Sequence, residues 1–313
     1  MTLQHRAGKV FIMKVAVLMS TYNGEAYIEE QIRSILAQKC DAQVCLWVRD
    51  DGSTDGTQEI LRQYAAEGKL SWYTGSNLRP ARSFMDLVTH CPGYDYYAFC
   101  DQDDMWYPEK LQEGIALLAG QDGPAMSFAN ARLVDGALNP IGRNVYNRQP
   151  PTDFYSVLCS GGILGCTVIY NRQLSELLQA FGQPEQLIMH DYYCAIICTL
   201  FDGVILFDPQ PRMDYRQHGN NVVGTQWTKR AAIKDRLSRI TKANPVSLAR
   251  MAQSILDRDP QPADPEKLRF LKAVATYRDS VKNTLSLALS RKPRFNGRNM
   301  AVTVRLSILF RNT

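Results

Sequence analysis

The chain has 313 residues, of which 45% are hydrophobic and 21% are charged. This length allows one large domain or two small ones, and the apolar fraction is sufficient for a buried core. The sequence contains no apolar run of about 18 residues, and residues 1–11 lack the apolar stretch of a secretory signal, so we expect a cytoplasmic protein. Eight scattered cysteines without paired zinc-site spacing indicate reduced, mostly buried thiols.

The charge is distributed unevenly along the chain. Residues 1–227 contain 17 lysines and arginines against 25 aspartates and glutamates, a balance of −8, whereas residues 228–313 contain 19 against 6, a balance of +13. A basic segment can contact nucleic acid or an anionic membrane surface. The acidic body favours a metal-chelated substrate over a polynucleotide that lies across the whole protein.

The first half of the chain alternates strand and helix patterns. After an N-terminal tail at residues 1–13, an apolar strand at 14–19 is followed by a polar loop at 20–24 and a helical pattern through Ile28, Ile32 and Ile35. A strand at 44–48, a turn at 50–56 and a helix at 57–66 follow, with further strands at 70–73 and 95–100. This order predicts an α/β fold with a mainly parallel sheet flanked by helices and functional loops at the carboxyl ends of its strands.

The second half of the chain has a mixed pattern. We expect a helix near 109–118, strands at 125–130 and 166–170, a glycine-containing patch at 160–162 and a helix at 192–200. From residue 229 to about 289, apolar residues recur at helical spacing among many lysines and arginines, with a proline-rich break at 259–265. Two or three terminal helices are predicted there, so we divide the chain into an α/β domain at 14–227 and a basic helical region at 228–313.

An acidic cluster directly follows the predicted strand at 95–100. Asp101, Asp103 and Asp104 would repel one another without a cation, and hard divalent ions such as Mg²⁺ or Mn²⁺ prefer oxygen ligands, including those of a diphosphate. The alternative is a solvated turn that caps the helix near Pro108. Because the cluster follows an apolar strand and two similar polar loops precede it, the metal site is favoured.

The two earlier loops have the chemistry to bind a nucleotide. Asp50 and Asp51 offer acceptors for a base or ribose, and nearby glycines allow close approach of a ligand to the backbone. Tyr22 could stack on a base while Thr21 forms a hydrogen bond with it. Considered alone, the loops are equally consistent with a tight turn and a helix cap.

The sequences STYNG at 20–24, DDGSTDG at 50–56 and DQDD at 101–104, in this order, resemble family 2 glycosyltransferases of the GT-A fold over about residues 14–225. The resemblance implies a nucleotide-sugar half at about 14–108 and an acceptor half at about 109–227. It assigns base and ribose binding to Thr21, Tyr22 and Asp50, with Asp51 beside them. It also implies that Asp101 approaches the ribose or the metal, Asp103 ligates the Mg²⁺ or Mn²⁺ cofactor and Asp104 supports them.

Two later segments extend the resemblance. Asp191, beside His190, matches the family's general base, which takes the proton of the acceptor hydroxyl in an inverting transfer; its alternative role is a helix N-cap. The segment at 214–221 is suited to closing over a diphosphate, with His218 as a further metal ligand and Arg216 as a nucleotide-sugar contact; a loop histidine is otherwise usually solvated. The segment that contains Gly161 and Gly162 resembles the acceptor side of the family's site, or is simply a tight turn.

The strings at 190–193 and 215–221 most resemble rhamnosyltransferase-like members, which implies transfer of rhamnose from dTDP-rhamnose to a saccharide or lipid-linked acceptor in bacterial cell-surface polysaccharide synthesis. A UDP-hexose donor is the alternative on the same fold. The rival of another class is a non-catalytic nucleotide-sugar or nucleic-acid binding protein, but we expect no nucleic acid partner because the basic segment lacks a recognisable motif. Residues 305–311 suggest peripheral contact with the inner face of the membrane, or a helix packed on the body.

Overall fold

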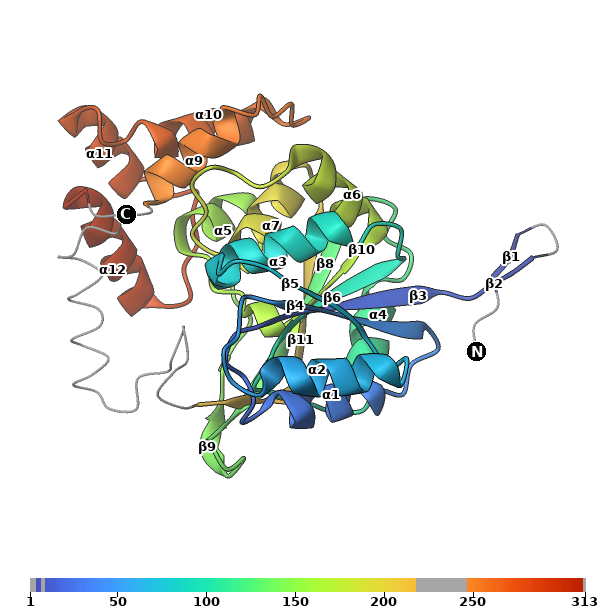
Figure 1. Ribbon diagram of the computed structural model, residues 1–313. Coiled ribbons are helices and arrows are strands. Elements are labelled where there is room, and N and C mark those ends of the chain that lie inside the picture. Colours follow the sequence, from blue (N-terminus) through green and yellow to red (C-terminus); the bar gives the residue numbers. More distant parts are fainter. Residues whose placement is uncertain (1–3, 7–8, 218–246, 312–313) are drawn as a thin grey trace.

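The computed structural model describes residues 4–6, 9–217 and 247–311 (Figure 1). A short hairpin of β1 (Gln4–Arg6) and β2 (Lys9–Phe11) stands apart from the central sheet. The sheet has nine strands, eight of them in the order β5-β4-β3-β6-β10-β8-β11-β7, while β9 pairs with β8. Helices cover both of its faces, so the predicted α/β architecture is confirmed.

The first half of the sheet is parallel. It comprises β3 (Lys14–Thr21), β4 (Gln43–Asp50), β5 (Ser71–Thr74) and β6 (Tyr96–Asp101), joined through α1 (Ile28–Leu36), α2 (Thr57–Ala66) and α3 (Arg79–His90). Strand β3 pairs with β4 on one side and with β6 on the other. The strand order therefore reverses at β3, which is where ligands bind in open α/β sheets.

The helices sort by the sheet face on which their apolar residues lie. On one face, α1, α2 and α4 (Lys110–Leu118) pack with buried residues such as Val15 and Val17. Helices α1 and α2 lie below the sheet in Figure 1. On the other face, α3, α6 (Arg172–Phe181) and α7 (His190–Leu200) pack with Ala16 and Leu18. These four consecutive residues of β3 are fully buried, because alternate side chains of this central strand point into the two apolar cores on opposite faces of the sheet.

The second half of the sheet contains both parallel and antiparallel strand pairs. It contains β7 (Met105–Trp106), β8 (Ala125–Val134), β9 (Pro140–Asn144), β10 (Val168–Asn171) and β11 (Val204–Arg216). Strand β10 runs antiparallel to both β6 and β8, while β11 runs parallel to β8. As a result, the start of β10 and the short turn η1 (Gly165–Thr167) before it lie at the same sheet edge as the carboxyl end of β6.

The described part of the C-terminal region contains four helices. Three of them lie before residue 289, where the sequence pattern predicted two or three, and the fourth lies beyond that range. They are α9 (Leu248–Leu256), α10 (Pro265–Ala275), α11 (Val281–Ala288) and α12 (Arg298–Leu309). The Ser280 side chain caps α11 by accepting from the Asn283 backbone, which starts a separate helix after α10. All four helices contribute to the same apolar core as α7, and α5 (Phe154–Ser160) packs between them and the sheet. No helix in the described ranges is long and apolar enough to cross a bilayer.

Candidate active site

The three predicted polar loops meet at one edge of the sheet. In the sheet register, Thr21 at the end of β3 lies opposite Asp50 of β4, and Ser20 lies opposite Asp101 of β6. This juxtaposition follows from the parallel pairing, which brings the carboxyl ends of the three strands together.

Gln102, which the sequence analysis did not select, connects the first loop to the acidic loop. Its Oε1 accepts from the Thr21 hydroxyl at 2.5 Å and from the Tyr22 backbone N–H at 2.9 Å, and its Nε2 donates to the Tyr22 carbonyl at 3.2 Å. The Tyr22 side chain remains 47% exposed. Its ring is therefore available to stack on a base, while its backbone is held in place.

The carboxylates of the second loop are occupied by internal hydrogen bonds. Asp50 is fully buried and accepts from the Thr74 hydroxyl at 2.8 Å, the Gln58 amide at 2.9 Å and the Ser53 backbone N–H at 3.1 Å. Asp51 is also buried; it pairs with the Arg49 guanidinium and accepts from a backbone N–H at 2.8 Å. These contacts fix the shape of the loop, and base or ribose binding by Asp50 and Asp51 stays a prediction.

The acidic loop forms a compact group with a cysteine. Ligand atoms of Asp101, Asp104 and Cys166 all lie within 4.8 Å of one another. Extending the register in which Ile169 faces Ala98 explains this contact, because it places Cys166 opposite Asp101. Asp104 is fully buried and its Oδ2 has no hydrogen-bond partner within the described ranges. A buried carboxylate oxygen without a hydrogen-bond donor can take a cation as its partner.

The electrostatics of this group explain why a cation would be stabilised there. Burial, followed by repulsion from Asp103 and Asp191, raises the pKa of Asp101 to about 7. Burial and repulsion from Asp103 and Asp101 likewise raise the pKa of Asp104 well above its usual range. Burial also raises the pKa of the Cys166 thiol well above its usual range, so the sulfur stays protonated and can donate to the carboxylates.

The residues that the structure brings together differ from the predicted metal ligands. They are Asp101, Asp104 and Cys166, whereas the sequence favoured Asp101, Asp103 and His218. Asp103 lies at the half-buried tip of the loop, and its role as a metal ligand stays a prediction. His218 lies outside the described residues.

Arg216 has a different position from the one expected of a diphosphate contact. Its buried guanidinium donates to the Asp103 carbonyl at 2.8 Å, the Gly136 carbonyl at 2.6 Å and Glu30 Oε2 at 2.5 Å, and it lies over the Tyr27 ring. Its backbone N–H donates to Asp104 at 3.2 Å. The pairing of β11 with β7 brings Arg216 to the acidic loop, where it bonds the loop backbone; its contact with a nucleotide sugar stays a prediction.

Lys110 is a further residue that sequence reasoning missed. Its ammonium is buried over the Trp106 ring at 3.9 Å, and Nζ has no hydrogen-bond partner among the described residues. Burial lowers its pKa to about 8, while Cys166, Cys100 and Asp104 act in the opposite direction. The sequence signal was weak, because a lysine in the first turn of an amphipathic helix normally faces solvent.

Asp191 lies at the start of α7, on the other side of the η1 turn. It is 8% exposed, and its Oδ1 accepts from the Tyr192 backbone N–H at 2.7 Å. Burial raises its pKa to about 6, although backbone hydrogen bonds from Tyr192 and Gly165 partly oppose this shift. Because the Asp191 charge also contributes to the raised pKa of Asp101, the predicted base and the acidic loop belong to one electrostatic site.

Gly165, which the sequence analysis passed over, separates these two halves. A Cβ atom at this position would lie 2.9 Å from His190 Nε2 and 3.0 Å from Asp191 Oδ2. The next residue, Cys166, contacts Asp101 and Asp104. The η1 turn therefore spans from the predicted base to Asp101 and Asp104 of the acidic loop, and no side chain fits between the turn and Asp191.

The remaining predicted residues are His190, Gly161 and Gly162. The His190 ring is buried, stacks on Phe84 at 4.0 Å, and burial lowers its pKa to about 3, so it is neutral near pH 7. Gly161 and Gly162 both have left-handed backbone angles, with φ of +56° and +97°, immediately after α5. They form the turn that leads into η1, whereas contact with an acceptor stays a prediction.

Comparisons with known proteins agree with this geometry. The model of the family described as glycosyl transferase family 2 matches residues 16–181. The chain is 30% identical over 236 residues to the dTDP-rhamnosyl transferase RfbG of Shigella flexneri. The aligned region covers 69% of this chain and 77% of that protein.

Solved structures with a similar fold include TarS 1-349 of S. aureus in complex with UDP and the mannosyltransferase PcManGT of Pyrobaculum calidifontis in complex with GDP-Man and Mn²⁺. The TarS match has 18% identity and a TM-score of 0.54 and covers 90% of this chain and 76% of that one. The PcManGT match has 19% identity and a TM-score of 0.53; it covers 95% of this chain and 74% of that one. At such identities the likeness concerns the fold, which is that of GT-A glycosyltransferases, whereas the family match extends over more than half of the chain. The protein is thus a glycosyltransferase that belongs to glycosyl transferase family 2.

Proposed function

We propose that this enzyme transfers rhamnose from dTDP-rhamnose, with inversion and with Mg²⁺ or Mn²⁺, to a saccharide or lipid-linked acceptor of bacterial cell-surface polysaccharide. The main support for a metal-dependent inverting transfer is that Asp191 lies close to the acidic loop, on the other side of the η1 turn. The choice of donor is supported by the identity to a dTDP-rhamnosyl transferase over most of both chains.

The nucleotide would bind where the first two loops meet the acidic loop. Tyr22 has an exposed ring beside Thr21, and Gln102 fixes both residues relative to Asp101. The internal hydrogen bonds of Asp50 hold the second loop in one conformation before a ligand arrives. Such preorganisation reduces the conformational entropy that donor binding must overcome.

The residues present fit a divalent cation. Asp101 and Asp104 supply hard oxygen donors, and the buried Asp104 Oδ2 lacks a partner within the described part of the chain. Asp103, at the tip of the same loop, can add a third carboxylate. When bound, the cation would neutralise charge on the diphosphate leaving group. Arg216 keeps the loop in place through its bonds to Asp103 and Asp104.

Asp191 is the proposed general base. In the transfer, the acceptor hydroxyl oxygen forms a bond to the anomeric carbon, the bond from that carbon to the diphosphate oxygen breaks, and the hydroxyl proton passes to the Asp191 carboxylate. A pKa of about 6 leaves this group ionised near neutral pH and more basic than an ordinary aspartate. Its hydrogen bond from the Tyr192 backbone fixes the orientation of the carboxylate for this role.

A panel of nucleotide sugars tests the donor. The enzyme with Mn²⁺ or Mg²⁺ should hydrolyse or transfer from dTDP-rhamnose, with release of dTDP as the readout. Turnover of UDP-glucose or UDP-galactose without turnover of dTDP-rhamnose would refute the rhamnose assignment and support the UDP-hexose alternative. The anomeric configuration of the product, read by NMR, tests inversion separately, because a retained configuration would contradict direct displacement.

The proposed site of action is the inner face of the cell membrane, where a lipid-linked acceptor is accessible from the cytoplasm. The support for peripheral contact is the basic C-terminal region, with 19 cationic against 6 anionic residues from position 228 onward.

A further inference from the structure

The C-terminal helices carry most of the strongly exposed large apolar side chains. Among the described residues, eleven such side chains are exposed, and seven of them lie between positions 281 and 310. Isolated apolar residues are common on protein surfaces, whereas a concentration of them in one region marks an interaction site.

Helix α11 presents three of these side chains as a stripe. Val281, Leu285 and Leu289 follow one another at a spacing of four residues and are 67%, 45% and 69% exposed. The adjoining side of the helix, with Thr284, Leu287 and Ala288, is buried against the protein. The stripe therefore lies on the exposed part of a helix whose inward side already has its partner.

Helix α12 packs antiparallel to α11 and extends this surface. Arg305 donates to the Ser290 carbonyl at 3.3 Å, and Arg311 donates to the Thr284 hydroxyl at 3.2 Å, so the chain directions of the two helices are opposed. Phe310, next to this second contact, is 62% exposed. The two helices form a hairpin at the outer end of the molecule (Figure 1).

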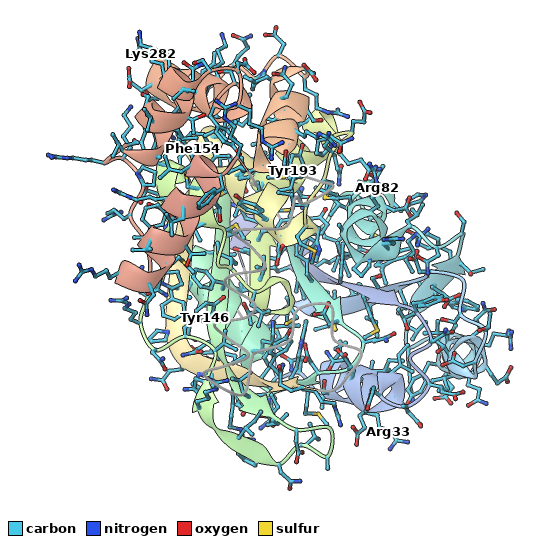
Figure 2. All side chains as sticks on the ribbon, turned by 90° about the vertical axis from the view of Figure 1, so that its left-hand side faces the viewer. Arg33, Arg82, Tyr146, Phe154, Tyr193 and Lys282 are labelled. Carbon is cyan, nitrogen blue, oxygen red and sulfur yellow. The ribbon has the colours of Figure 1, made fainter. Side chains whose placement is uncertain are left out.

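The charge of the hairpin has a single sign. No aspartate or glutamate follows Asp279, while seven lysines and arginines do. Two of the seven form ion pairs with residues outside the hairpin, Lys292 with Glu266 of α10 and Arg294 with Asp153. Lys282, Arg291 and Arg298 are exposed, and Figure 2 shows Lys282 at the outer edge of these helices.

We propose that the exposed face of the α11–α12 hairpin is a docking surface for a bilayer that contains anionic lipids. The apolar stripe would enter the interfacial region, and the surrounding cations would pair with lipid phosphates. A nucleic acid would match the cations but would not bury the apolar stripe. A second copy of this chain would bring two cationic faces together, which disfavours self-association.

The hairpin is connected to the acceptor side of the proposed site. The Arg294 backbone N–H donates to the Ser156 hydroxyl at 2.8 Å, and its side chain pairs with Asp153 at the start of α5. Helix α5 leads directly into Gly161, Gly162 and the η1 turn. A bilayer bound by the hairpin would therefore be held at a fixed position relative to the segment beside Asp191, with α5 as the connection. The inference rests on the proposed function, in which the acceptor is lipid-linked, but its test needs no turnover.

The test is flotation of the full chain with vesicles of phosphatidylcholine, with or without phosphatidylglycerol. The double variant Leu285→Asn, Leu289→Asn removes the stripe at exposed positions and should lower binding to the anionic vesicles by about tenfold or more. Lys282→Glu with Arg291→Glu should lower it by a similar factor and should reduce its salt dependence. The matched control is Leu36→Asn, because Leu36 is 43% exposed on α1, outside the hairpin.

The outcomes separate docking from catalysis. Loss of vesicle binding by both hairpin variants, with normal binding by Leu36→Asn and unchanged donor hydrolysis in solution, would support the proposal. Failure of the unmodified protein to bind anionic vesicles, equal binding to neutral vesicles, or unchanged binding by the hairpin variants would overturn it. A concentration-dependent dimer that the Leu285→Asn, Leu289→Asn variant abolishes in analytical ultracentrifugation would assign the surface to self-association instead. Lack of donor hydrolysis by a protein that still binds vesicles would count against the proposed function alone.

Discussion

Substitution of Gly165 by alanine tests whether the η1 turn sets the position of the proposed base. The added Cβ would lie 2.9 Å from His190 Nε2, 3.0 Å from Asp191 Oδ2 and 3.2 Å from Asp191 Cβ. Ordinary contacts begin at 3.4 Å, so relief of the clash requires a shift of at least 0.4 Å at Asp191 Oδ2 or of the turn itself. Gly165 is not in the left-handed region, so the effect comes from contact rather than from backbone strain.

The expected loss follows from the sensitivity of transfer to geometry. A misplacement of about 1 Å can cost about 100-fold in rate, so a shift of about half that size predicts a fall in kcat of about tenfold. Overpacking of this kind should also lower the free energy of unfolding by about 1–3 kcal/mol. Binding of dTDP and Mn²⁺ should change little, because the three nucleotide loops do not include this turn.

The assay is steady-state turnover together with calorimetric titration of dTDP. Gly123→Ala is the matched control, since a Cβ there meets nothing within 4 Å and its φ is not left-handed. A folded Gly165→Ala enzyme with the kcat of the unmodified protein would refute the reasoning. A parallel loss of nucleotide affinity would show that the turn also supports the donor loops.

Four further predictions concern the charged residues. Asp191→Asn should lose transfer by at least about 100-fold with donor binding retained. The pKa of Asp191 is raised from 3.8 to about 6 in the folded state, so its ionisation destabilises the fold increasingly from about pH 4 to pH 6 and fully above that. In denaturant unfolding, the Asn variant should be more stable by up to about 3 kcal/mol at pH 7.5 and about equally stable near pH 4. For the same reason, kcat should fall about tenfold per pH unit below about pH 6, and a flat pH–rate profile there would contradict a base role. Arg216→Gln should destabilise the protein by on the order of 3 kcal/mol and weaken Mn²⁺ binding in calorimetry, whereas the exposed Arg62→Gln should do neither. Chelation should abolish transfer, Mn²⁺ or Mg²⁺ should restore it, and Asp103→Ala should weaken donor binding only when metal is present.

The sequence alone predicted the architecture and the location of the site. Short apolar runs that end in polar loops identified β3, β4 and β6, and local periodicity identified α1 and α2 to within about one residue. Helix α3 (Arg79–His90) was not predicted, although Pro80 at its start is a helix signal. Its apolar residues Phe84, Leu87 and Val88 lie on one face, so the helical spacing of apolar residues was present in the sequence but was not recognised after the preceding polar loop.

The contacts within the site depended on tertiary structure, because residues far apart in sequence create them. Gln102 connects two loops about eighty positions apart, and nothing near it in the chain distinguishes it from an ordinary polar residue. Arg216 was assigned to the diphosphate by its neighbours in sequence, whereas the pairing of β11 with β7 places its guanidinium among internal acceptors.

The sequence by itself determined the order of the strand-end loops, the acidic cluster that begins at Asp101 and the aspartate at the start of α7. These features depend only on the residues of each segment and on its local periodicity, so they can be recognised in the amino-acid sequence. The tertiary structure alone decided that β10 runs antiparallel, and this direction places Gly165 against Asp191 and Cys166 against Asp101 and Asp104. A strand's direction and register depend on long-range pairing, so the spacing between the proposed base and the proposed metal ligands could not be predicted from the sequence.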